Sequence, residues 1–88
     1  MSIIVICPES RDYTREVDEY VRDYMRRTGR EIEVLNPESR EGADFCRSYD
    51  IVEYPSMMAL SDDGSVLKKW SGLPFPLMDE VTFYDQEN

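Results

Sequence analysis

The sequence predicts a single α/β domain, 1–88, in which a four-stranded mixed sheet carries helices on both faces. Two observations lead to this prediction. In the first half of the chain, short apolar runs that suit strands alternate with stretches of helical periodicity. In the second half, two further apolar runs are separated only by a tight turn. Strands that alternate with helices pair in parallel, whereas a tight turn joins antiparallel strands. The 88 residues suffice for one core.

The first half of the chain predicts a strand, a helix, a second strand and a second helix. Residues 3–6 form a continuous β-branched run, which suits a strand buried on both faces. Residues 13–24 carry apolar side chains at the spacing of one helical stripe. Residues 31–35 alternate polar and apolar side chains as a strand does. Residues 40–49 indicate a short helix, with Cys46 on its inner side.

The second half predicts an antiparallel hairpin followed by a short final helix. Residues 56–60 and 65–70 are the two strands, and Asp-Asp-Gly at positions 62–64 is a typical hairpin turn. Apolar side chains then recur at helical spacing between residues 77 and 84. The complete order is β-α-β-α-β-β, with a further α at the end.

The first predicted strand ends at Cys7, which Pro8 follows directly. Proline is favoured at the first position of a helix, because its missing N–H would have no partner there. The pattern therefore predicts that the next helix starts at Pro8, with Cys7 as its N-cap. A thiol there is favoured as the thiolate, since the unpaired N–H groups stabilise negative charge. Glu9 opposes this effect, because a nearby carboxylate raises a thiol pKa.

Charge and composition exclude several classes of function. The chain has 19 acidic and 10 basic residues and a net charge of −9, which argues against nucleic acids and anionic membrane surfaces as partners. No apolar run reaches the roughly 18 residues that a membrane helix needs, and no basic leader precedes the first strand, so we expect a cytoplasmic protein. Without histidine and with two cysteines, neither structural zinc nor Ser-His or Cys-His catalysis is expected.

The stretch that leads into Pro55 resembles a known family. Residues 49–56 end in Tyr54-Pro55-Ser56 and are followed by an apolar strand, a turn that ends in Gly64, a second strand and Gly72. This arrangement, over residues 2–73, resembles the thioredoxin-like superfamily, which includes thioredoxin and glutaredoxin. The resemblance implies the thioredoxin-like fold. It also implies that Pro55 is a cis-proline that lines a substrate groove, with Tyr54 and Ser56 as substrate-binding neighbours. From the residues alone, an ordinary trans proline at the start of a strand stays open.

The same resemblance implies a role for the motif Cys7-Pro8-Glu9-Ser10. Cys7 matches the attacking cysteine, Pro8 lines the substrate site, and Ser10 stands where two-cysteine members have the resolving cysteine. The residues alone leave a second interpretation open, in which Cys7 is an inert, small apolar residue that ends a strand. Cys46 fits a buried core thiol, or a disulfide with Cys7 if the two Cα atoms lie within about 7 Å.

Two functions follow. The first is monothiol thiol–disulfide exchange, in which Cys7 attacks a protein disulfide and Ser10 donates a hydrogen bond to the sulfur; we prefer it as the family default. No cofactor is required, and glutathione is the one co-substrate that the resemblance suggests, although Pro8-Glu9 departs from the Cys-Gly-Phe-Ser motif of monothiol glutaredoxins. The alternative is a non-catalytic domain of the same fold that binds a protein segment beside Pro55. The sequence leaves the oligomeric state open.

Overall fold

A computed structural model describes residues 2–9 and 11–85. Its elements, in chain order, are β1 (Ser2–Ile6), α1 (Thr14–Thr28), β2 (Glu33–Leu35), α2 (Arg40–Tyr49), β3 (Ser56–Leu60), β4 (Val66–Ser71) and α3 (Met78–Asp85). The predicted order of strands and helices is confirmed, and it includes the final helix.

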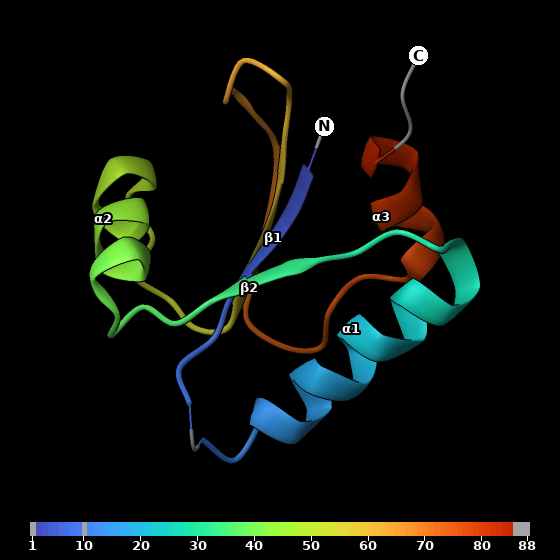
Figure 1. Ribbon diagram of the computed structural model, residues 1–88, viewed down its shortest axis with the longest axis horizontal. Coiled ribbons are helices and arrows are strands. Elements are labelled where there is room, and N and C mark those ends of the chain that lie inside the picture. Colours follow the sequence, from blue (N-terminus) through green and yellow to red (C-terminus); the bar gives the residue numbers. More distant parts are fainter. Residues whose placement is uncertain (1, 10, 86–88) are drawn as a thin grey trace.

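The four strands form one mixed sheet in the order β2-β1-β3-β4 (Figure 1). β1 is parallel to β2, while the β1–β3 and β3–β4 pairs are antiparallel. β1 and β3 are therefore the central strands, and β2 and β4 are the two edges. This is the predicted α/β sheet, with a parallel pair from the first half of the chain and a hairpin from the second.

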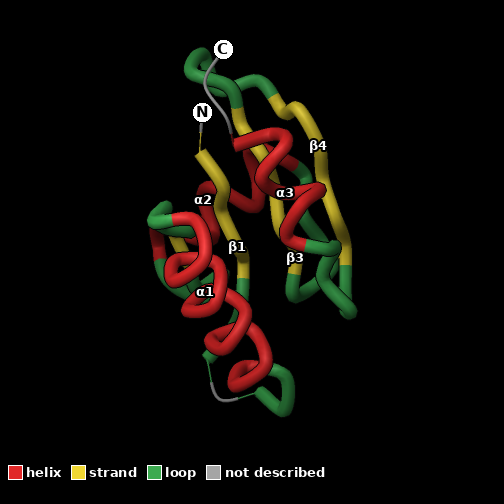
Figure 2. Tube along the Cα trace, turned by 90° about the vertical axis from the view of Figure 1, so that its right-hand side faces the viewer, coloured by secondary structure: helices red, strands yellow, loops and turns green. Residues whose placement is uncertain are grey.

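Helices cover both faces of the sheet. α1 and α3 pack on one face and α2 on the other (Figure 1), and Figure 2 looks onto α1 and α3 with β4 at the sheet edge. Alternate residues of β1 enter the two resulting cores: Ile3 and Val5 face α1 and α3, whereas Ile4 and Ile6 face α2. All four side chains are at most 7% exposed, so β1 is buried on both faces, as its β-branched run predicts.

The first helix starts later than the sequence predicts. α1 begins at Thr14, with Tyr13 as its N-cap, so the prediction that Cys7 caps a helix starting at Pro8 is wrong. The reason lies in packing, because most helical stability in proteins comes from burying an apolar face. The apolar stripe begins only at Tyr13, and the preceding side chains of Arg11 and Asp12 are exposed.

Hydrogen bonds between residues far apart in the sequence hold the final helix, α3, and the residues before it against α1 and the residues after it. The Tyr24 hydroxyl donates to a carboxylate oxygen of Asp85 at 2.7 Å, and the Tyr20 hydroxyl donates to the Pro76 carbonyl at 2.7 Å. The Arg30 guanidinium donates to the Asp85 carbonyl at 2.8 Å. Asp85 is only 4% exposed, and the Tyr24 hydroxyl, together with the Arg30 guanidinium 3.9 Å from the other carboxylate oxygen, offsets the cost of burying its carboxylate.

The first turn of α2 leaves no room for a side chain at Gly42. The Ser39 hydroxyl caps this helix by accepting the Gly42 N–H at 3.0 Å. A Cβ at Gly42 would lie 1.8 Å from the carbonyl oxygen of Asn36. Because that oxygen belongs to the backbone, the turn before α2 would have to move to admit it.

We therefore expect Gly42→Ala to lower the free energy of unfolding by about 2 kcal/mol or more. Glu41→Ala, one position earlier on an exposed site of the same helix, should change it by less than about 0.5 kcal/mol. Urea denaturation followed by circular dichroism measures both values. Equal stability of the two variants would show that the close approach at Gly42 is not a constraint.

Tyr20 should make the fold sensitive to high pH. Burial, helped by the nearby charge of Glu80, raises the pKa of Tyr20 from 10.0 to about 12. The raised pKa means that Tyr20 favours the folded state below pH 10, and this contribution is lost as the pH rises towards 12. We expect the urea midpoint to fall less steeply over this range in Tyr20→Phe than in the wild type. Parallel pH profiles would contradict the assignment.

Candidate functional site

The ends of the central strands meet at one corner of the sheet. The β1–β3 register pairs Ile6 with Ser56. Cys7, which follows Ile6, therefore lies next to Pro55, which precedes Ser56. The Cys7 N–H donates to the Leu35 carbonyl at 2.9 Å, which ties the corner to β2. The Tyr54–Pro55 peptide bond is cis. The fold thus brings together the two stretches that the sequence singles out.

Pro55 also connects this corner to the end of the hairpin. The Gly72 N–H donates to the Pro55 carbonyl at 2.8 Å. Gly72 has a φ of 76°, and a Cβ there would lie 3.1 Å from a carboxylate oxygen of Glu53. The chain therefore needs glycine at this turn. The hydrogen bond from Gly72 holds the residues that follow β4 next to Pro55.

Cys7 is a buried thiol in this arrangement. Its side chain is 5% exposed and packs in the core between the sheet and α1. The Cys7 thiol donates to the Pro8 carbonyl at 3.3 Å. Burial raises its pKa above the ordinary value and the charge of Asp18 acts in the same direction, while a hydrogen bond with Thr14 opposes them only in part. At neutral pH the side chain is therefore a protonated thiol rather than a thiolate.

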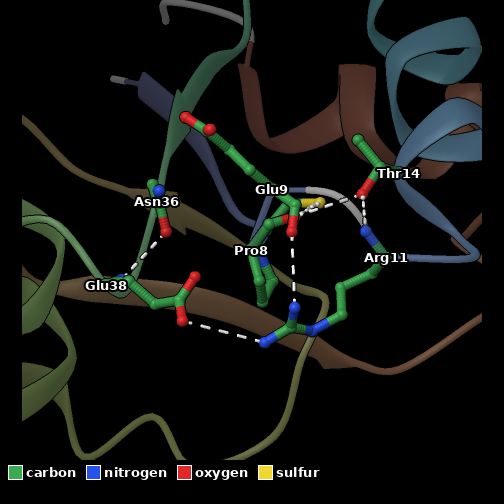
Figure 3. Close-up of polar contacts among 7 residues, drawn as sticks. Pro8, Glu9, Arg11, Thr14, Asn36 and Glu38 are labelled. Carbon is green, nitrogen blue, oxygen red and sulfur yellow. Dashed lines mark hydrogen bonds and ion pairs between the residues drawn. The ribbon is translucent and has the colours of Figure 1, made fainter.

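Polar contacts stabilise Pro8, Glu9 and Arg11, which follow Cys7 in the sequence (Figure 3). The Thr14 hydroxyl accepts the Arg11 N–H at 3.0 Å and donates to the Pro8 carbonyl at 3.2 Å. The Arg11 guanidinium reaches back to the Glu9 carbonyl at 3.5 Å and to the Glu38 carboxylate at 3.8 Å. These bonds hold Pro8, Glu9 and Arg11 against the start of α1 and against the turn after β2.

Ser10, which the sequence places at the position of a resolving cysteine, lies outside the described residues. Its expected hydrogen bond to the sulfur of Cys7 stays a prediction.

The accessible part of the corner is the segment before Pro55. Pro8, Pro55 and Ser56 are buried, and the Ser56 hydroxyl donates to the Glu53 carbonyl. By contrast, Tyr54 is 38% exposed and Val52 is 83% exposed. Of the predicted substrate-binding residues, Tyr54 is the one whose side chain can meet a partner directly. Sequence reasoning did not select Val52, because nothing in the sequence distinguishes it from its neighbour Ile51, which is buried.

Cys46 lies in the opposite core. It is 8% exposed and packs beneath α2, whereas Cys7 packs on the side of α1. Both cysteines are free thiols, so the predicted alternative of a Cys7–Cys46 disulfide is not formed, and Cys46 is a buried core thiol. Burial, together with the neighbouring Cys46 thiol, raises the pKa of Tyr54, which links this side of the corner to α2.

Within residues 2–9 and 11–85, no group of three or more cysteine, aspartate or glutamate side chains gathers in a way that could hold a metal ion. No helix in the described part of the chain has the length and apolar character needed to cross a membrane.

Comparison with known proteins shows the fold. No protein-family model matches the chain, and no curated protein matches its sequence. Thioredoxin 1 from the thermophilic eubacterium Thermosipho africanus TCF52B superposes with a TM-score of 0.69 over 97% of this chain and 90% of its own, at 14% identity. A malarial protein superposes with a TM-score of 0.65 over 97% and 94%, at 11% identity. At these identities the likeness is one of architecture: the chain has a thioredoxin-like fold.

Proposed function

We propose that this chain is a non-catalytic domain of thioredoxin-like fold that binds an extended segment of a partner protein beside Pro55. The observation that carries the proposal is the burial of Cys7, the residue on which thiol–disulfide exchange would depend. The Tyr54–Pro55 peptide bond at this corner is cis, while the thiol beside it is withdrawn from solvent.

The state of Cys7 argues against a nucleophilic role. The thiolate is the species that attacks a disulfide, and it must reach its substrate. Cys7 is 5% exposed, and burial raises its pKa, so it is neither ionised at neutral pH nor accessible. The helix N-terminus that could stabilise a thiolate begins at Thr14, seven positions further along the chain.

The surface at the corner favours a binding role. Val52 and Tyr54 offer apolar contact area directly before Pro55, on a segment that leads into a central strand. A tyrosine that is partly buried is a rigid anchor for a peptide, because it loses little side-chain freedom on binding. The exposed carboxylates of Glu9 and Glu53 border the same corner and favour a segment that carries positive charge, whereas that of Glu38 is paired with Arg11.

Monothiol exchange is the second candidate, and one observation favours it. Cys7 lies beside Pro55, as the register of β1 and β3 requires, and its hydrogen bond with Thr14 lowers the thiol pKa. In that reaction the Cys7 thiolate attacks a partner disulfide, forms a mixed disulfide and releases the other partner sulfur as a thiolate. Glutathione is the small co-substrate for this candidate. The reaction requires the corner to open far enough to expose the sulfur.

Alkylation of Cys7 separates the two functions. We expect iodoacetamide to modify Cys7 in the folded protein at pH 7 on the order of 100 times more slowly than in urea-unfolded protein. The rate should go on rising with pH beyond pH 9 before it levels off, because it follows the thiolate fraction and burial raises the thiol pKa above its ordinary value of 9.0. Mass spectrometry of the digested protein quantifies modification at Cys7 and Cys46 separately.

An insulin-reduction assay with dithiothreitol completes this test. The wild type should be no faster than Cys7→Ser, which serves as the matched control. Folded-state alkylation with a midpoint below pH 8, together with turnover that disappears in Cys7→Ser, would establish the monothiol candidate instead.

Peptide selection tests the binding role. Phage display against the folded domain should enrich peptides that combine apolar and basic residues. A synthetic peptide from the selection should shift the amide signals of residues 52–54, 56 and 71–73 in an ¹⁵N NMR spectrum. Val52→Asp should weaken binding by about tenfold or more, which corresponds to about 1.4 kcal/mol.

Leu77→Asp is the matched control, because Leu77 is 81% exposed and Val52 is 83% exposed, yet Leu77 precedes α3 rather than Pro55. Its effect should stay below twofold. Equal losses in the two variants, or amide shifts elsewhere on the surface, would refute the assignment of the binding surface.

A further inference from the structure

The sulfur atoms of the chain differ in their access to solvent. The chain has two cysteines and five methionines. Cys7 and Cys46 are at most 8% exposed. Met57 and Met58, both in β3, are fully buried. A dissolved oxidant reacts fastest with sulfur that it can reach, so the fold protects these four side chains.

Met25 is the sulfur-containing residue with the greatest exposure in the part of the chain that the structure describes. It lies in the last turn of α1, and its side chain is 43% exposed. Met78, at the start of α3, is only partly exposed and packs against the core beneath α1. Met25 is therefore the position at which an oxidant first meets sulfur in the folded domain.

A hollow in the surface gives small molecules access to Met25. It has a volume of about 280 Å³ and is lined by Val21, Arg22, Met25, Glu31 and Ile32. A water molecule occupies about 30 Å³ of liquid volume, and hydrogen peroxide roughly twice that. The hollow can therefore admit hydrogen peroxide together with water, next to the Met25 side chain.

We propose that Met25 is a site of reversible oxidation, at which hydrogen peroxide converts the thioether into a sulfoxide while the domain stays folded. The sulfur attacks one peroxide oxygen, and the O–O bond breaks. The released hydroxide takes the proton of the transferred oxygen and leaves as water, so that the sulfur loses two electrons and the peroxide gains them. A dithiol reductant acting through a methionine sulfoxide reductase restores the thioether and forms a disulfide and water.

The surroundings of Met25 can accommodate the oxidised side chain. A sulfoxide oxygen is a hydrogen-bond acceptor, and Arg22 lies beside Met25, three positions earlier on the same helix and in the same hollow. Within the described residues the Arg22 guanidinium makes no hydrogen bond or ion pair, so its N–H groups are available to the new oxygen. Oxidation should therefore make one wall of the hollow polar without disturbing the core.

Peroxide treatment of the full chain, followed by mass spectrometry, tests the proposal. Cleavage after glutamate places Met25 in the peptide 20–31, and the peptide 54–80 carries Met57, Met58 and Met78, which fragment ions separate. In the folded protein we expect Met25 to gain oxygen at least about tenfold faster than Met57 and Met58. In urea the rates should become similar, because unfolding exposes every side chain.

Two leucine variants and a reductase complete the test. Met25→Leu conserves side-chain volume and should remove the fast oxidation, whereas Met78→Leu, the matched control, should retain it. The oxidised wild type should keep its circular dichroism spectrum, and methionine sulfoxide reductase with dithiothreitol should restore its mass. Oxidation of Met25 no faster than that of Met57, fast oxidation that survives in Met25→Leu, unfolding on oxidation at Met25 alone, or a sulfoxide that the reductase leaves unchanged would each overturn the proposal. None of these outcomes depends on peptide binding beside Pro55.

Discussion

The pairing of β1 with β3 is the constraint on which the rest of the structure depends. All four residues from Ile3 to Ile6 are apolar and buried, so the hydrophobic pattern of β1 alone would tolerate a shift by one residue. Contacts at the ends of the strands restrict the register where the hydrophobic pattern does not. The Cys7 N–H binds the Leu35 carbonyl, and β3 begins at Ser56, whose buried hydroxyl is satisfied by the Glu53 carbonyl. The first contact fixes β1 against β2, and the second fixes the point at which β3, the antiparallel partner of β1, begins.

That register places Cys7 and also determines its chemistry. Cys7 continues the face of Ile3 and Val5, and this face lies beneath α1. The same alternation that sets Cys7 beside Pro55 therefore carries its sulfur into the core, where burial raises the thiol pKa. For the Cys7 thiol, lying beside Pro55 and being reactive are separate properties. A location beside Pro55 does not make Cys7 reactive, because disulfide attack requires an accessible thiolate.

Local sequence patterns predicted the strands and helices, because each apolar run or stripe must be buried wherever it lies. They misplaced the start of α1. Pro8 is a sound local signal for a helix start, but the next residues offer no apolar side chain to pack, and the helix begins at Thr14. Contacts between distant residues, such as the bond from Tyr24 to Asp85, leave no periodic trace in the sequence. The exposure of Val52 follows from the path of the loop and could not be predicted either.

The two edges of the sheet are protected against pairing with another strand in different ways. β4 carries Lys68 and Lys69, the only lysines of the chain, on exposed positions. Lysine on an edge strand is a common means of preventing edge-to-edge pairing, since its charge cannot be desolvated beside a second strand. β2 has Val34 at an exposed position instead, and its protection is its length, because an edge strand of three residues offers few backbone groups to another strand.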